Sequence, residues 1–127
     1  MPSDRENDKK NVAAFYDYLI NKKDFQAAAR YIGPHYRQHN PLVGDQAEGL
    51  EAFCNFLRTN FPEAHSEIKR IFAVDDHVIL HVHSTRTPGT RGRAIVEIFR
   101  LEDGKIVEHW DVIQEIPAES ANPNGMF

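Results

Sequence analysis

Apolar residues recur at helical spacing through the first half of the chain and at alternate positions through the second half. One stripe, at positions i, i+3, i+4, i+7 and i+8, comprises Val12, Phe15, Tyr16, Leu19 and Ile20. Such a stripe is typical of an amphipathic helix that covers a core. "SDRE" at 3–6 has the form of a capping box, so we predict that this helix begins with Ser3 as its N-cap.

Two further helices are expected before residue 62. Asp24 is placed to cap a short second helix, which "GP" at 33–34 ends. A third helix is predicted from about Ala47 to Asn60, followed by Pro62. Its apolar stripe comprises Leu50, Phe53, Cys54 and Leu57.

After Pro62 the apolar period changes from 3.6 to 2, which predicts strands. The expected strands are about 66–74, 77–87, 93–102 and 105–116. The connection "EDGK" contains Asp-Gly, a strong hairpin signal, so the strands should form an antiparallel meander. The extended piece "HYRQHNP" at 35–41 is a candidate for an additional edge pairing. Helices first and strands last indicate an α+β fold.

Alternation along the strands assigns their side chains to two faces, and both faces are mixed. The strand expected at 77–87 has one face with Val78, Leu80 and Val82 and another with Ile79, His81 and His83. The strand at 93–102 has one face with Ile95, Glu97 and Phe99 and another with Val96, Ile98 and Arg100. The strand at 105–116 has one face with Val107, His109, Asp111 and Ile113 and another with Ile106, Glu108, Trp110, Val112 and Gln114. Three helices can cover only one face of such a sheet. Periodicity alone leaves open which face that is.

Composition limits the class of protein. A chain of 127 residues with 41% hydrophobic content suits one domain, here 1–127, with a core at about 8–117 and a tail at 118–127. Fifteen basic and nineteen acidic residues include no basic stripe, so we do not expect a nucleic-acid partner. A single cysteine, a polar N-terminus and the lack of a long apolar run favour a cytoplasmic protein without a membrane segment.

The order of these elements, with "HNP" at 39–41 and "GKIVEHWD" at 104–111, resembles the SnoaL-like polyketide cyclases of the nuclear transport factor 2-like superfamily. It is most similar to a subgroup of predicted SnoaL-like aldol-condensation enzymes. The resemblance implies a curved antiparallel sheet whose concave face is covered by the N-terminal helices, forming a cone with a central pocket.

The resemblance also implies roles for particular residues. Asp111 matches the general acid/base aspartate of the cyclases, and Glu97 stands where those enzymes have an assisting histidine. Similarity to the more distant ketosteroid isomerase places Tyr16 at an oxyanion-binding tyrosine, whereas Asn40 replaces that enzyme's catalytic carboxylate. Steroid isomerisation is therefore disfavoured.

An intramolecular aldol closure requires a base, donors for the enolate oxygen and an apolar pocket. We expect Asp111 to be the base, with Glu97 and His83 as partners and with Tyr16 and His39 as donors. The expected substrate-binding set comprises Tyr16, His39, Asn40, His81 and His109. The predicted activity is that of a cofactor-independent cyclase, isomerase or lyase acting on a small carbonyl compound, with no metal.

Each of these residues also has a structural interpretation. His81 and His83 could be ordinary half-buried strand residues, and Asp111 could simply hold His109 or a backbone group. His39 and Asn40 before Pro41 could form a turn. Tyr16 could serve the core alone. A zinc or iron site is the rival chemistry, with ligands drawn from His81, His83, Glu97, His109 and Asp111.

A non-catalytic binding or assembly module is the alternative function, because one fold supports many functions. The convex face of the sheet is expected to carry a large apolar patch, a usual sign of an interface. The expected members are Trp110, Val96, Ile98, Val82 and Leu80. We predict a homodimer through this face, with the C-terminal tail a candidate for crossing to the partner.

Overall fold

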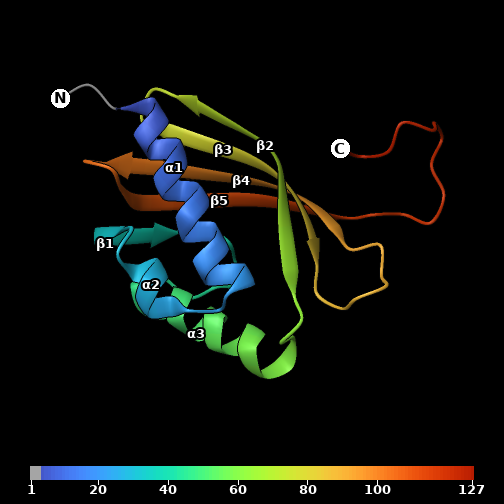
Figure 1. The fold of residues 1–127 in the computed structure, drawn as a ribbon, viewed down its shortest axis with the longest axis horizontal. Helices are drawn as coiled ribbons and strands as arrows, with labels where there is room; N and C mark the ends of the chain where they lie inside the picture. The colour runs from blue at the N-terminus through green and yellow to red at the C-terminus, as the bar shows by residue number, and fades with distance from the viewer. Residues whose placement is uncertain (1–3) are drawn as a thin grey trace.

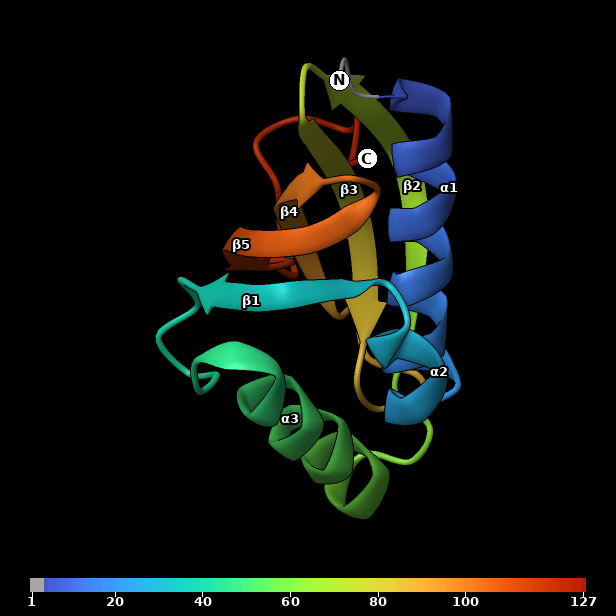
Figure 2. The ribbon, with the colours of Figure 1, turned by 90° about the vertical axis from the view of Figure 1, so that its left-hand side faces the viewer.

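The structure, a computed structural model, describes residues 4–127. Three helices pack on one side of a curved, unclosed sheet, as Figures 1 and 2 show. In chain order the elements are α1 (Arg5–Tyr16), a π-helical turn (Asp17–Asn21), α2 (Phe25–Ala29), β1 (Ile32–Gln38), α3 (Gln46–Asn60), β2 (His65–Val74), β3 (His77–Thr85), β4 (Arg93–Glu102) and β5 (Lys105–Glu115).

The sheet has five strands in the order β1-β5-β4-β3-β2. Strands β2 to β5 form the predicted antiparallel meander. The predicted edge pairing is present: β1 lies parallel to β5, and Gln38 is the register partner of His109. The predicted α+β architecture, with helices over the concave face, is confirmed.

The first helix starts one residue later than expected. Its N-cap is Asp4, whose carboxylate accepts a hydrogen bond from the backbone N of Asn7 at 3.1 Å; Ser3 lies outside the described residues. Beyond Tyr16 the helix widens into the π-helical turn, where the Lys22 N–H donates to Asp17 O at 2.9 Å. Every residue of the predicted apolar stripe is buried.

The burial pattern of β3 shows which face of the sheet the helices cover. Val78, Leu80 and Val82 are fully buried under α1 and against β2, whereas His81 and His83 point to the opposite side. On the concave face β3 supplies these three apolar side chains and, near its end, Ser84. The acidic and imidazole groups of the cavity therefore come from β4 and β5. The prediction that Leu80 and Val82 belong to the convex patch is therefore wrong.

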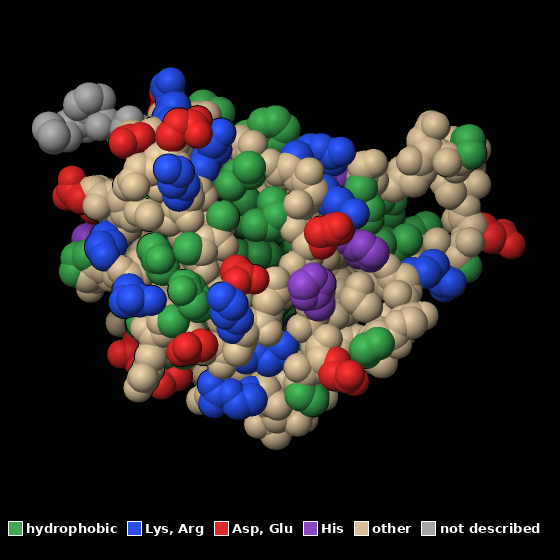
Figure 3. All heavy atoms as spheres, in the orientation of Figure 1, with side chains coloured by type: hydrophobic (Ala, Val, Ile, Leu, Met, Phe, Trp, Pro, Cys, Tyr) green, Lys and Arg blue, Asp and Glu red, His purple; other side chains and the backbone are tan. Residues whose placement is uncertain are grey.

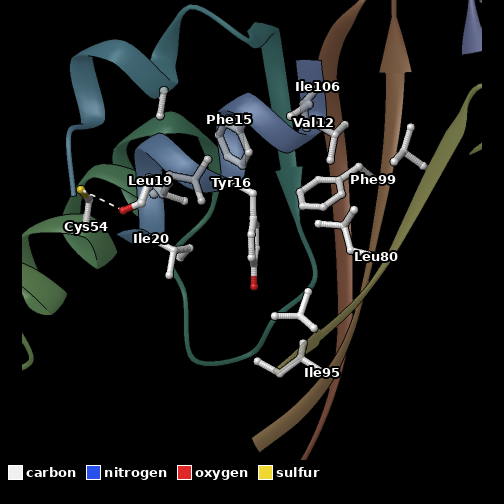
Figure 4. Close-up of a cluster of buried hydrophobic side chains, with 14 of the residues drawn as sticks. Val12, Phe15, Tyr16, Leu19, Ile20, Cys54, Leu80, Ile95, Phe99 and Ile106 are labelled. Atoms are coloured by element: carbon white, nitrogen blue, oxygen red, sulfur yellow. Dashed lines mark hydrogen bonds between the residues drawn. The ribbon is translucent and has the colours of Figure 1, made fainter. Parts of the chain in front are cut away.

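The core lies between α1 and the sheet, as Figure 4 shows. The Phe15 and Phe99 rings meet edge to face with centroids 5.9 Å apart, a favourable aromatic geometry. Cys54 is buried, as its place in the helical stripe predicts, and its thiol lies 3.7 Å from Leu19 O. Tyr16 extends from α1 among these side chains with its hydroxyl directed away from the helix.

The convex face carries exposed apolar side chains. Phe72, Val74 and Val112 are 52%, 55% and 67% exposed. Trp110 lies on this side, as predicted, and its ring stacks on His39 at 4.9 Å between centroids. The tail beyond β5 contains no helix or strand, and its final residue, Phe127, brings its ring to 5.2 Å from His81 and 4.8 Å from His83.

Basic and acidic side chains are interspersed on the face drawn in Figure 3, with no continuous basic stripe. Among residues 4–127, none of the helices has the length and apolar character needed to cross a membrane.

Candidate active site

A cavity of about 370 Å³ lies between the concave face of the sheet, the end of α1 and α3. Its walls are mostly aliphatic and aromatic. The polar side chains along it are Tyr16, Tyr36, Gln38, Asn40, Ser66, Ser84, Arg86, Arg93, Glu97, His109 and Asp111. A largely apolar pocket with a few convergent polar groups is the usual form of a small-molecule site.

Two carboxyl groups meet on the floor of this cavity because β4 and β5 are in register. Glu97 is the direct partner of Asp111, and Phe99 is the partner of His109. In an antiparallel pair, directly opposed side chains lie close together on the same face. The three polar groups Glu97, His109 and Asp111 offer ligand or proton-accepting atoms within 4.8 Å of one another.

Glu97 is buried and has a partner for each carboxyl oxygen. The Tyr16 hydroxyl donates to Oε2 at 2.6 Å, and His109 Nε2 lies 2.7 Å from Oε1. On the other side of the imidazole, His109 Nδ1 lies 2.7 Å from Gln38 Oε1. That oxygen also accepts from the backbone N–H groups of His39 and Asn40, both at 3.0 Å.

These contacts fix the proton arrangement. An amide oxygen can only accept, so His109 Nδ1 carries a hydrogen. The short contact between Nε2 and Glu97 Oε1 then requires one further proton, held either by the imidazole or by the carboxyl group. Glu97 and His109 therefore share a proton next to Asp111.

Asp111 has a different environment. Oδ2 accepts a hydrogen bond from Asn40 Nδ2 at 2.8 Å and lies 3.9 Å from His109 Nε2. The side chain is only 9% exposed. Burial, followed by the neighbouring Glu97 charge, raises the Asp111 pKa above its ordinary value, against the opposing effects of Asn40 and His109. The expectation that Asp111 lines the main cavity beside Glu97 is confirmed.

The two tyrosines of the cavity differ in their hydroxyl hydrogens. Burial raises the pKa of Tyr16 well above its usual range, and its hydrogen is committed to Glu97. Burial likewise raises the pKa of Tyr36, whose oxygen accepts from Gln38 Nε2 at 2.9 Å. The Tyr36 hydroxyl donates to no acceptor within residues 4–127. Tyr36 is thus the tyrosine with a free donor.

Three predicted site residues lie elsewhere. His81 and His83 are on the convex side of β3, where His81 Nδ1 contacts the Arg70 guanidinium and His83 Nε2 lies 2.8 Å from Arg91 O. His39 points away from the cavity, and its Nε2 lies 2.7 Å from Glu108 Oε2. The prediction that these histidines face the cavity is wrong, because strand alternation gives each the opposite parity to the buried residues of its strand.

Sequence reasoning missed Tyr36 and Gln38, although a signal was present. In "HYRQHNP" they alternate with Arg37 and His39 and share the parity of Asn40. Applying the period-2 rule to this short strand would have grouped Tyr36, Gln38 and Asn40 on one face. Arg86 and Arg93, which also line the cavity, were missed as well.

The geometry reduces the five candidate metal ligands to three. Glu97, His109 and Asp111 are close enough together to hold an ion. His81 and His83, on the other face, cannot join them. Glu97 is hydrogen-bonded to His109 and Tyr16, and Asp111 is hydrogen-bonded to Asn40. An ion would have to displace part of that network.

Comparison with known proteins identifies the family. The SnoaL-like domain matches residues 12–109, and the chain belongs to this family. No curated protein sequence matches the chain significantly.

Solved structures share the fold at low identity. The chain is similar to a SnoaL-like protein of unknown function from Burkholderia thailandensis, with a TM-score of 0.75, 17% identity, and coverage of 91% of this chain and 100% of that chain. A putative polyketide cyclase from Bacillus cereus has a TM-score of 0.73, 21% identity, and coverage of 84% and 74%. AclR, a putative hydroxylase from Streptomyces galilaeus, has a TM-score of 0.72, 24% identity, and coverage of 87% and 90%.

Proposed function

We propose that this protein is an enzyme that moves protons on a small carbonyl compound, as a cyclase, isomerase or lyase of the aldol type. The observation that supports this most is the Glu97–His109–Asp111 cluster at the floor of an apolar cavity. A raised carboxyl pKa brings a base closer to the operating pH, where general base catalysis is most effective.

In the proposed reaction the Asp111 carboxylate removes a proton from the carbon next to the substrate carbonyl. The Tyr36 hydroxyl, which has no acceptor in the described part of the chain, donates to the resulting enolate oxygen. The enolate carbon attacks a second carbonyl carbon of the same molecule and forms a C–C bond. The new alkoxide then takes the proton back from Asp111, so the step is an isomerisation with no net loss of atoms.

Glu97, His109 and Tyr16 act on Asp111 indirectly in this scheme. Both Glu97 oxygens have protein partners, so Glu97 is poorly placed to accept a substrate proton. Instead, Glu97 and His109 share a proton, and the position of that proton determines the charges that act on the Asp111 pKa. Tyr16 is therefore a positioning residue, in place of the oxyanion donor that the resemblance implied.

The test is turnover of a panel of diketones and open-chain polyketide-type compounds, followed by mass spectrometry and NMR. We expect the wild-type protein to convert at least one of them and Asp111→Asn to lose that conversion. Asp103→Asn is the matched control: Asp103 lies in the exposed β4–β5 turn at φ 51°, a conformation that asparagine tolerates. Turnover that survives in Asp111→Asn would contradict the proposal.

A non-catalytic binder is the second candidate, and the same experiment separates it. The saturated hydrogen bonds around Glu97 are compatible with a fixed polar floor that only orients a ligand. In that case compounds would bind in the cavity and be recovered unchanged from the wild-type protein.

We also propose that two copies pair through the convex face. Phe72 and Val74 on β2 and Val112 on β5 are exposed apolar side chains of this face, and Val112 is the register partner of the exposed Val96. Exposed apolar groups on one face commonly mark an interface. Sedimentation velocity at micromolar concentration should show a dimer that Val112→Asp weakens and Asp103→Asn does not. A wild-type monomer under those conditions would contradict the pairing.

A further inference from the structure

Two arginines stand at the end of the cavity away from the acidic cluster. Arg93 begins β4 and is the register partner of Ser84 on β3, while Arg86 follows the end of β3 directly. Ser66 on β2 is in turn the register partner of Ser84. All four side chains line the cavity. Glu115 on β5 is the other register partner of Arg93, but it does not line the cavity and forms no ion pair with either arginine. The side chains that line this end are therefore basic and hydroxyl-bearing, in contrast to the carboxyl-rich floor.

The donors at this end have no acceptor among the residues that the structure describes. Neither the Arg86 nor the Arg93 guanidinium forms a hydrogen bond or ion pair with a residue in the described range 4–127. The buried Ser66 Oγ, although near the Tyr16 hydroxyl, also lacks a hydrogen-bond partner among those residues. A guanidinium offers five N–H donors. Ser66 is a buried polar group, and such groups are almost always paired.

Arg86 is held in place by aromatic rings instead of by an acid. Its guanidinium carbon lies 5.6 Å from the Phe56 ring centroid and 5.2 Å from that of Phe61. Burial, and then the like charge of Arg93, lowers the Arg86 pKa, against the opposing effect of the Glu115 charge. Two cations kept close together in a partly dry site form an arrangement that an anion would stabilise.

We propose that the ligand of this cavity is an organic carboxylate, whose anionic group lies between Arg86 and Arg93 while its carbonyl lies at Asp111. This inference deepens the proposed function and rests on it for the position of the carbonyl. Arginine favours carboxylate and phosphate because its planar fork can donate two parallel hydrogen bonds.

The strand register gives the spacing between the two ends. Arg93 and Glu97 are four residues apart on β4, which corresponds to about 13 Å between their Cα atoms. The row of concave residues between them is apolar and comprises Val82, Ile95 and Ile113. The ligand should therefore have an apolar chain between its carboxylate and its carbonyl group.

The test uses unreactive probes, so that it does not depend on turnover. Binding of decanoate, decyl phosphate and the neutral analogue decanol is measured by calorimetry with the wild-type protein, Arg86→Gln and Arg93→Gln. Each replacement should weaken decanoate binding roughly tenfold or more, as expected for loss of a charge-assisted hydrogen bond. Decanol binding should change less than about twofold, which also shows that the cavity is intact.

Two controls separate this inference from the proposed function. Arg5→Gln removes an equal charge from a side chain that is 59% exposed and paired with Asp75, and it should leave decanoate binding unchanged. Asp111→Asn should retain decanoate binding while losing turnover. Equal affinity for decanoate and decanol in the wild-type protein would overturn the carboxylate site, and preferred binding of decyl phosphate would assign the arginines to a phosphate ester instead.

Discussion

Asp111→Asn should make the protein more stable at neutral pH, because the native carboxylate is buried next to a second carboxyl group. Asp111 faces the Glu97 carboxyl across the β4–β5 pair and is 9% exposed. An asparagine there can still accept the hydrogen bond from Asn40 Nδ2, and its own amide N–H can donate to Glu97. The substitution thus replaces a repulsive contact with an attractive one.

The size of the gain follows from the distance between the groups. Two unit charges within 4.8 Å of each other repel by about 3 kcal/mol at an effective dielectric constant near 20. Removing the Asp111 charge also removes the cost of burying it, which is the largest cause of its raised pKa. The attraction between Asp111 and any positive charge on His109, 3.9 Å away, opposes both effects, so we expect a net gain of about 1–3 kcal/mol in the free energy of unfolding. For 127 residues, with an unfolding entropy of about 2.1 cal/mol/K each, the melting temperature should rise by about 4–11 °C.

The pH dependence of this gain checks its cause. Because the folded-state pKa of Asp111 is raised, the native protein binds more protons than the unfolded chain between the two pKa values, and its stability falls as pH rises through that window. The stability difference between Asp111→Asn and wild type should therefore be smallest near pH 4 and largest at neutral pH. Urea denaturation from pH 4 to 8 measures it. An asparagine variant that is less stable than wild type at pH 7, or a difference that does not change with pH, would refute the reasoning.

Three further substitutions test individual contacts. Tyr16→Phe removes the 2.6 Å hydrogen bond to Glu97 and should cost about 1.5–3 kcal/mol, measured by urea denaturation; an unchanged midpoint would show that this bond adds nothing. Tyr36→Phe should lower kcat by about tenfold to a thousandfold with little change in stability, since it removes the donor to the enolate oxygen, and an unaltered kcat would exclude that role. Leu80→Ala should cost about 2–5 kcal/mol, whereas His81→Ala on the opposite face should cost less than about 1 kcal/mol; the reverse order would contradict the assignment of faces.

The elements of the fold were predictable because their signals are local. The helical stripe from Val12 to Ile20, the Asp24 cap and the Asp-Gly turn at 103–104 each depend on a few neighbouring residues. The paired approach of Glu97 and Asp111 also followed, since both share the parity of apolar residues on adjacent strands joined by a tight turn.

The side chains on β3 and β1 were harder to place because their assignment depends on tertiary packing. Either face of β3 could have met the helices, and the purely apolar row Val78, Leu80 and Val82 was buried in preference to the row that carries His81 and His83. Burying those two imidazoles would have required two further sets of hydrogen-bond partners. The free hydroxyl of Tyr36 depends on contacts between β1 and β5, which no local pattern specifies.

The central claim is that Asp111 removes a proton from carbon, and hydrogen exchange tests it without knowledge of the natural substrate. In D2O, NMR would follow the replacement of hydrogen by deuterium next to the carbonyl of 2-decanone, a neutral ketone that does not depend on the arginines. We predict that wild-type protein and Asp103→Asn accelerate this exchange and that Asp111→Asn reduces the acceleration by about 10²-fold or more, as expected for loss of a general base. Exchange in Asp111→Asn at the wild-type rate would contradict the claim.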